Sequence, residues 1–191
     1  LRRQRQMCIR DRHDTMKNPV TDICDLNREL PPDAPDAPQW LVDALQVPRE
    51  EGWVNSDGCD VHYFRWGDPA NPPLLLMHGF LAHARCVAFI APFLAEQYHV
   101  VAYDLSGMGD SGVRSSYPDA VRAQEVVDVA RETGLFDHAI KPIVIAHSYG
   151  GHVGLAAMND FHELFGGLVV CDLMVLLSLI HISEPTRLSV I

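Results

Sequence analysis

The feature that most constrains the fold is the regular alternation of short apolar segments with longer helix-like segments from Pro73 onward. Short apolar runs are typical of strands in a parallel sheet whose two faces are both covered. The segments between them have the length and periodicity of the covering helices. The sequence therefore predicts an α/β domain with a mostly parallel sheet, strands at residues 74–77, 100–103, 143–146 and 168–171, and helices at residues 86–97, 119–133 and 150–164.

The residues before this segment divide into a leader and a hairpin. Residues 31–38 read PPDAPDAP, a rigid and polar stretch, and we place the domain boundary there, ahead of an amphipathic turn at residues 40–45. Residues 52–55 and 60–66 have β-rich alternation, and Ser56-Asp57-Gly58 supplies turn residues between them. Residues 13–50 are therefore interpreted as a leader with a proline-rich linker.

Both ends of the chain resemble translated sequencing adapters. Residues 2–12 read RRQRQMCIRDR and residues 177–187 read LSLIHISEPTR, which match the translations of the two ends of a widely used adapter. We therefore expect residues 1–12 and 177–191 to be artefacts. Residues 51–176 are then expected to be a partial domain, the N-terminal piece of a longer protein, truncated after about the sixth strand.

The charge of the remaining chain argues against nucleic acid as a partner. Without the two end segments, nine basic residues stand against 23 acidic ones, which gives a formal net charge of −14. Phosphate backbones repel so acidic a chain. The N-terminal arginine cluster belongs to an end segment, so it does not indicate a nucleic-acid-binding arm.

The apolar and cysteine content is consistent with a cytoplasmic protein without a membrane partner. The run from Leu164 to Ile182 has the length of a membrane span, but Asp172 interrupts it and its last third is end segment, so we predict a buried strand instead. We find no signal peptide before the α/β segment. Neither close pairing nor metal-ligand spacing occurs among the four cysteines outside the end segments, Cys24, Cys59, Cys86 and Cys171.

A serine at a strand-to-helix turn is the sharpest indication of chemistry. The sequence AHSYGG at residues 146–151 lies directly between a predicted strand and a predicted helix. A strained turn of this kind requires small residues two positions before and after Ser148, and Ala146 and Gly150 meet that need. A serine N-cap followed by glycines would produce the same pattern, so the pentapeptide alone leaves both interpretations open.

A second motif is the predicted strand LLLM at residues 74–77, which leads into a turn formed by His78, Gly79 and Phe80. A histidine in such a turn is better explained by ordering the loop through backbone contacts than by catalysis.

A third motif, DLSGMGDS at residues 104–111, follows the strand predicted at residues 100–103. Its glycines allow a sharp turn, and Asp104 is interpreted as a carboxylate that ties the loop together. The glycines of residues 107–112 also fit the G-x-G-x-x-G of a dinucleotide-binding turn. That turn should open a helix, but residues 113–118 intervene, which disfavours the nucleotide hypothesis.

Together these motifs resemble the α/β-hydrolase family over about residues 52–172. The serine turn is similar to the family's nucleophile elbow, G-x-S-x-G, with Ala146 in place of the first glycine. The resemblance implies an α/β-hydrolase fold in which Ser148 attacks a carbonyl carbon. It also implies that the backbone N–H groups of Phe80 and Tyr149 form the oxyanion hole. Supporting roles then fall to Ala146, Gly150, His78, Gly79 and Asp104.

The rest of the family's catalytic triad is not recognised in this chain. The family requires an acid and then a histidine after the serine. His152 and His162 belong to a predicted helix and His181 to an end segment, while Asp172 is a minor candidate for the acid. A serine without a base is a weak nucleophile, so we expect the polypeptide as written to be inactive.

For the intact parent the resemblance implies a serine hydrolase that acts on a small-molecule ester or related acyl substrate, without metal or organic cofactor. A serine at the elbow argues against the haloalkane dehalogenase and epoxide hydrolase branches, which attack with a carboxylate. Two alternatives remain open. One is a cofactor-free peroxidase or C–C bond hydrolase of the same fold, and the other is a noncatalytic binding protein that keeps the fold.

Overall fold

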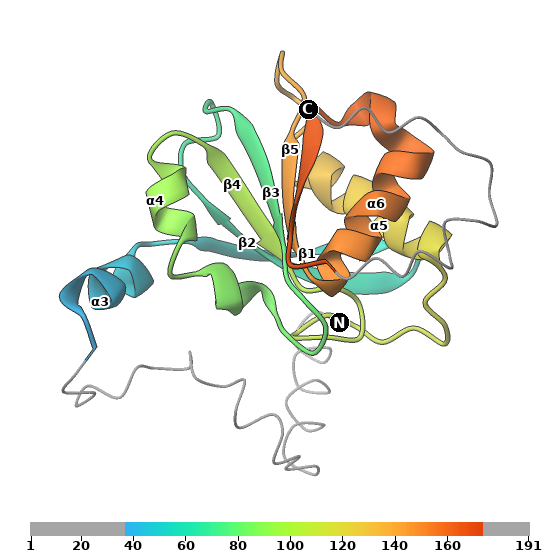
Figure 1. The fold of residues 1–191 in the computed structure, drawn as a ribbon, viewed down its shortest axis with the longest axis horizontal. Coiled ribbons are helices and arrows are strands. Elements are labelled where there is room, and N and C mark those ends of the chain that lie inside the picture. Colours follow the sequence, from blue (N-terminus) through green and yellow to red (C-terminus); the bar gives the residue numbers. More distant parts are fainter. Residues whose placement is uncertain (1–36, 174–191) are drawn as a thin grey trace, which may run out of the picture. The chain divides into compact units, whose positions relative to one another are not determined.

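The structure is a computed structural model, and it describes residues 37–173 (Figure 1). The chain divides into two compact units, and the boundary between them lies between Val47 and Pro48. The helix α3 (Gln39–Gln46) belongs to the first unit, at the predicted amphipathic turn. The second unit holds the sheet and every motif considered above. The predicted adapter segments lie outside the described residues.

The second unit contains a six-stranded sheet in the order β1-β2-β4-β3-β5-β6. The last four strands of the chain run parallel to one another, while β2 runs antiparallel to both β1 and β4. This confirms the predicted mostly parallel sheet. The strands are β1 (Glu50–Ser56), β2 (Cys59–Trp66), β3 (Pro73–Met77), β4 (His99–Tyr103), β5 (Ile143–His147) and β6 (Gly167–Cys171).

The hairpin is formed by β1 and β2, with Ser56 opposite Cys59. Its two loop residues, Asp57 and Gly58, have φ values of 45° and 78°. Positive φ at both central residues is typical of the two-residue turns that match strand twist, and it explains the Asp-Gly sequence. The Gly58 N–H also donates to the Asn55 side chain at 3.2 Å, which holds the turn closed.

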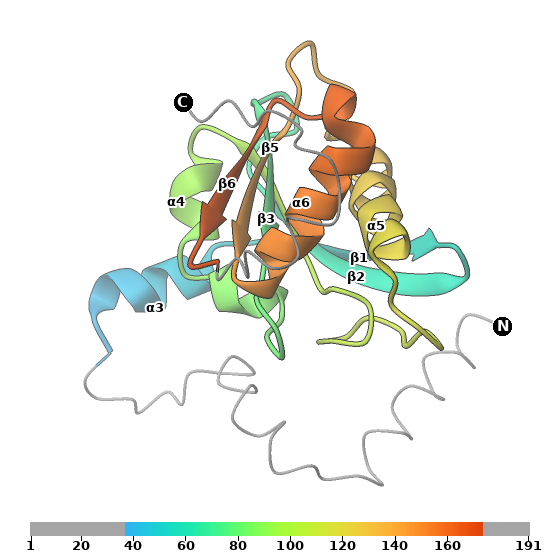
Figure 2. The same cartoon turned by 45° about the vertical axis from the view of Figure 1, so that its right-hand side comes forward.

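Helices cover both faces of the sheet (Figures 1 and 2). α5 (Asp119–Glu132) and α6 (Tyr149–Phe161) pack against each other on one face, and α6 continues into a 3₁₀ turn, η2 (His162–Leu164). The other face carries α4 (Ala91–Ala95). The core lies between the sheet and the α5–α6 layer, where Leu75 and Val101 are fully buried with Val126 of α5.

The helix predicted at residues 86–97 is wrong as a single element. The structure has a 3₁₀ turn, η1 (Ala84–Val87), and then the separate short helix α4. Pro92 explains the break, because it has no N–H to donate to a preceding turn and its ring clashes with the carbonyl four residues earlier. Proline is tolerated at the start of a helix, which is where α4 places it.

The apolar run that begins at Leu164 contains β6, as predicted, but this strand is not buried. Val169 is 49% exposed, because within the described residues β6 pairs only with β5. Nor does any helix between residues 37 and 173 have the length and apolar character needed to cross a membrane.

Truncation of Leu75 should destabilise the fold strongly, because this residue is fully buried in the central strand β3. We expect Leu75→Ala to lower the free energy of unfolding by about 2–5 kcal/mol. Urea unfolding followed by circular dichroism measures the change. The matched control is Leu155→Ala on α6, where the side chain is 38% exposed and the loss should be smaller. Equal losses would contradict this assignment of the core.

Candidate functional site

Ser148 lies between β5 and α6 in a strained conformation with positive φ (φ 49°, ψ −117°). Residues other than glycine rarely adopt positive φ, so the surrounding structure must hold this residue in place. The Ser148 N–H donates to Cys171 O at 2.8 Å, and the Gly151 N–H donates to Ser148 O at 2.8 Å. An ordinary N-cap has extended dihedral angles and a side-chain cap bond. Ser148 has neither within the described residues, so the N-cap alternative does not fit.

The glycines that follow Ser148 allow α6 to pack closely against the sheet. A Cβ added to Gly150 would lie 2.5 Å from His78 O and 3.1 Å from Met77 Cβ. One added to Gly151 would lie 2.8 Å from Val170 Cγ1. Gly154, which the sequence motif did not include, is under the same constraint, because its added Cβ would lie 2.9 Å from the Leu168 side chain on β6.

His78 ties together the loops that follow β3 and β4. Its Nε2 accepts from the Leu105 N–H at 3.0 Å, so the ring proton is assigned to Nδ1, which donates to Gly79 O at 2.7 Å. Burial lowers the pKa of His78, which favours this neutral form. The side chain therefore contacts backbone groups on both sides and is 3% exposed.

The turn after β3 passes directly beside the elbow. A Cβ added to Gly79 would lie 2.9 Å from His147 Nδ1 and 3.3 Å from Ser148 Cβ. Among residues 37–173, the Phe80 N–H donates to no backbone carbonyl. The Tyr149 N–H begins α6, and an amide in the first turn of a helix has no intrahelical acceptor. The rings of Phe80 and Tyr149 meet edge to face at 5.7 Å.

Asp104 is fully buried, and its carboxylate is the hub of the loop after β4. It accepts from the Ala84 N–H at 2.5 Å and the Asp110 N–H at 2.8 Å, and it contacts His62 Nδ1 at 2.8 Å. Burial opposes ionisation, but these hydrogen bonds outweigh it and lower the pKa of Asp104. The carboxylate oxygens of Asp104 are therefore engaged by groups within the fold, and Asp104 ties the loop after β4 to its surroundings.

His62, which sequence reasoning missed, bridges two carboxylates. Its Nε2 contacts Glu51 Oε1 at 2.8 Å while its Nδ1 faces Asp104. Burial opposes the ring's charge, but the hydrogen bond and negative charge of Asp104 and the hydrogen bond to Glu51 raise the pKa of His62 overall. No sequence signal identifies this group, because His62 and Asp104 lie 42 residues apart.

Glu51, His62 and Asp110 also have metal-ligand atoms within 4.8 Å of one another. Both ring nitrogens of His62 are already engaged, and Arg85 Nη1 forms an ion pair with Asp110 at 2.6 Å. A metal ion would have to displace these contacts. The cluster is therefore better described as a satisfied ion-pair network than as a ligand set.

The glycine-rich loop does not have the geometry of a dinucleotide-binding turn. The Gly107 N–H donates to Gly112 O at 2.7 Å, and the Gly112 N–H donates to Asp60 O at 2.8 Å. The next helix, α5, begins only at Asp119. The Gly107 and Gly112 amides are thus already engaged, one within the loop and one with β2, and no helix N-terminus follows the loop directly.

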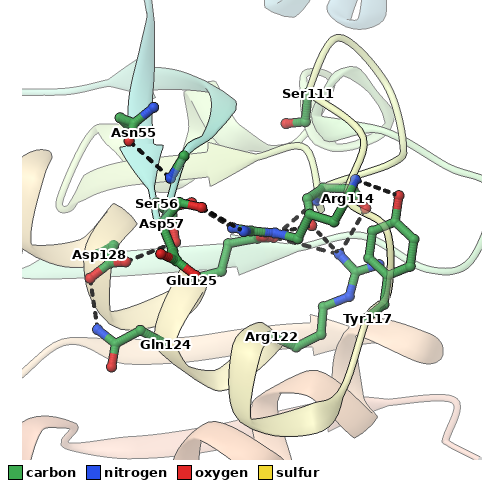
Figure 3. A network of polar contacts seen from close by, with 12 residues as sticks. Asn55, Ser56, Asp57, Ser111, Arg114, Tyr117, Arg122, Gln124, Glu125 and Asp128 are labelled. Carbon is green, nitrogen blue, oxygen red and sulfur yellow. Dashed lines mark hydrogen bonds and ion pairs between the residues drawn. The ribbon is translucent and has the colours of Figure 1, made fainter.

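A buried ionic network fixes this loop to α5 and to the hairpin (Figure 3). The Glu125 carboxylate accepts from the Ser106 N–H at 2.9 Å and pairs with Arg114 at 3.2 Å. Arg114 also donates to Ser56 O at 2.8 Å, at the turn of the hairpin. Arg122 donates to Ser106 O at 2.9 Å and stacks over the Tyr117 ring at 4.5 Å. Removing Glu125 would leave two buried cations without a counterion.

The remaining candidates for the triad are His152, His162 and Asp172. His152 is exposed on α6, and His162 is exposed in η2. Asp172 follows β6 at the elbow's edge of the sheet, but its carboxylate lies 4.0 Å from His147 Nε2 and is 91% exposed. An exposed contact of this length contributes little. The structure therefore brings the elbow and the turn after β3 together, without an assigned base.

The sheet order and the strained serine between β5 and α6 define the class to which this chain belongs. A profile of the alpha/beta hydrolase family matches residues 74–189, which is more than half of the chain. The chain therefore belongs to the alpha/beta hydrolase family.

Three known proteins are similar to this chain. The chain is 28% identical over 116 residues to an uncharacterized hydrolase, YugF, of Bacillus subtilis (strain 168), covering 60% of this chain and 41% of that protein. It is 29% identical over 132 residues to a soluble epoxide hydrolase of Corynebacterium sp. (strain C12), covering 69% of this chain and 43% of that protein. A solved structure of a membrane phospholipase A, a bacterial virulence factor, superposes with a TM-score of 0.64 at 25% identity. The match covers 88% of this chain and 50% of the phospholipase chain. The chain thus spans less than half of the two curated relatives.

Adding a methyl group at Gly150 should strain the elbow, because the new Cβ would meet backbone atoms that cannot move independently. We expect Gly150→Ala to lower the free energy of unfolding by about 1–3 kcal/mol. The matched control is Gly167→Ala in β6, where an added Cβ meets nothing within 4 Å. Chemical denaturation of both variants measures the difference. Equal stability would show that α6 does not pack as closely as described.

The raised pKa of His62 makes stability depend on pH in a defined direction. Protonation favours the folded state, so this contribution is complete below the unfolded pKa of about 6.5 and is lost as the pH rises through the folded pKa. We expect wild-type protein to lose more stability than His62→Asn when urea unfolding is compared between about pH 6 and pH 9. Parallel pH profiles for the two proteins would contradict the assigned network.

Proposed function

We propose that the protein represented by this chain is a serine hydrolase that cleaves an ester or related acyl bond, with Ser148 as the nucleophile. The observation that carries the proposal is the positive φ of Ser148 between a parallel strand and a helix. Ser148 is half-buried at the carboxyl ends of the parallel strands, which is where open α/β folds bind ligands. Such strain is retained where the surrounding structure enforces it, which is typical of functional sites.

The backbone around Ser148 supports an oxyanion hole made by the amides of Phe80 and Tyr149. Both N–H groups lack a backbone acceptor within the described residues, and the turn that carries Phe80 lies against the elbow. Donors that are already fixed can stabilise a developing negative charge without a reorganisation cost. His78 and Asp104 would act as positioning residues, because they fix the loops after β3 and β4.

The proposed reaction is acyl transfer. Ser148 Oγ attacks the carbonyl carbon as a histidine base takes its proton, and the carbonyl oxygen becomes the anion held by the two amides. The ester C–O bond then breaks, and the leaving oxygen takes the proton from the histidine. Water next attacks the acyl-enzyme by the same route and releases the acid. We place the base and its acid partner in the part of the family's fold that follows the described residues.

The serine distinguishes this proposal from epoxide opening, although a relative is named a soluble epoxide hydrolase. Branches of this fold that open epoxides attack with a carboxylate, and Ser148 stands at that position here. We propose a small-molecule acyl substrate, no metal or organic cofactor, and a cytoplasmic location. Cys59, Cys86 and Cys171 are free thiols in the described part of the chain, which fits a reducing compartment.

An active-site-directed fluorophosphonate tests the proposal. A longer version of the protein, extended through its gene, should be labelled at Ser148, and Ser148→Ala should lose labelling and lower ester hydrolysis by roughly 10⁶-fold. The control is Ser116→Ala, because Ser116 is exposed on the loop before α5. An unlabelled longer protein would support the noncatalytic alternative. Strong labelling of the 191-residue chain would contradict the placement of the base.

A further inference from the structure

The two residues whose amides form the proposed oxyanion hole also contact each other through their side chains. The ring centroids of Phe80 and Tyr149 lie 5.7 Å apart, and the ring planes make an angle of 72°. Aromatic rings attract each other in this edge-to-face arrangement. Phe80 belongs to the turn after β3 and Tyr149 to the first turn of α6. The ring contact therefore joins two segments that are distant in the sequence.

The turn that carries Phe80 is exposed and strained. The Ala82 N–H donates to Gly79 O at 3.3 Å, which closes the turn. Phe80 and Leu81 are its two central residues, and each is 63% exposed. Leu81 has a φ of 55°, a conformation that favours glycine. Such a turn needs support from outside itself to hold the Phe80 amide in one place, and the Tyr149 ring supplies a contact of this kind.

The Tyr149 ring is itself supported from the interior of the protein. Tyr149 is half-buried against the core, and the guanidinium carbon of Arg122 lies over its ring, 5.8 Å from the centroid. A cation within about 6 Å of a ring centroid is attracted to the ring. Arg122 is only 3% exposed, donates to the carbonyl and hydroxyl oxygens of Ser106 and stacks over Tyr117 (Figure 3). The Tyr149 ring therefore links a buried cation on α5 to the exposed turn after β3.

We propose that the side chain of Tyr149 is a positioning group, which holds the Phe80 amide in place beside the Tyr149 amide so that both N–H groups face one oxyanion. This inference rests on the proposed serine hydrolase function. The two amides belong to separate elements, and such donors stabilise a transition state only when their geometry is set before the reaction. Loss of the ring contact should therefore weaken binding of the transition state, where the oxyanion forms, more than binding of the neutral substrate.

A second ring pair provides a matched control. The rings of Phe136 and Phe165 also meet edge to face, with centroids 5.6 Å apart and an interplanar angle of 67°. Phe136 lies between α5 and β5, and Phe165 lies just before β6. This pair is therefore at the amino ends of the parallel strands, whereas Ser148 follows the carboxyl end of β5. Substitution of Phe136 should lower stability without affecting the elbow.

A double-mutant cycle in the 191-residue chain tests the ring contact without reference to activity. Phe80→Leu and Tyr149→Leu each remove one ring and keep an apolar side chain. We expect the double variant to lose less stability than the sum of the two single losses, because each single substitution already removes the ring pair. Urea unfolding measures the three losses. Phe80→Leu combined with Phe136→Leu should give additive losses, and additivity in the Phe80–Tyr149 cycle as well would overturn the inference.

Kinetics of the longer protein test the positioning role. Tyr149→Leu should lower kcat for 4-nitrophenyl acetate by roughly two- to tenfold, the range expected for an aromatic pair, and change KM by less than about twofold. Tyr149→Phe keeps the ring and should recover most of the lost rate. Phe136→Leu should keep the wild-type kcat. Titration of Ser148 with the fluorophosphonate counts the competent sites, so misfolded protein does not affect kcat.

The outcomes separate this inference from the proposed function. If Ser148 of the longer wild-type protein is not labelled, both fail. If Ser148 is labelled and Tyr149→Leu keeps the wild-type kcat, or loses only affinity for the substrate, the positioning role alone is overturned. An equal loss of kcat in Tyr149→Leu and Phe136→Leu would also overturn it, because the effect would then be one of general stability.

Discussion

The strained conformation of Ser148 depends on the close packing of α6 against the sheet. Gly150 contacts the backbone after β3, and Gly151 and Gly154 contact side chains of β6, so the helix cannot move outward without losing these contacts. The hydrogen bond from the Ser148 N–H to Cys171 O fixes the turn from the other side. A residue held in this way needs no side-chain cap bond to keep its conformation, which is compatible with the proposed role of its hydroxyl as a nucleophile.

Buried polar groups cross-link the loops around the elbow. His78 joins the ends of β3 and β4, and Asp104 joins β4 to η1 and to His62 of the hairpin. Parallel strands bring these loops to one edge, but only the side-chain contacts fix their relative positions. The proposed oxyanion hole depends on such support, because preorganised donors must be held to within about 0.5 Å of the productive geometry.

The sequence predicted the features that depend on local pattern and missed those that depend on distant contacts. The strands were predictable because buried parallel strands are apolar throughout, and the hairpin because Asp57-Gly58 suits positive φ at both positions. The helix predicted at residues 86–97 failed because its apolar pattern continues through Pro92, which starts a new helix. The Gly154 contact and the His62–Asp104 pair could not be predicted, since both depend on how separate elements pack, α6 against β6 and β2 against the loop after β4.

Buried polar side chains at the two ends of the parallel strands differ in how fully they are hydrogen-bonded. At the carboxyl end, His78 uses both ring nitrogens and the Asp104 carboxylate accepts from several donors, so these groups stabilise a single loop arrangement. At the amino end, His99 and the Nε of Arg65 are buried without partners in the described part of the chain. Such atoms carry a desolvation cost that an apolar side chain in the same position would avoid. Buried polar groups therefore organise the loops at the carboxyl end of the strands, whereas at the amino end they lower the stability of the fold.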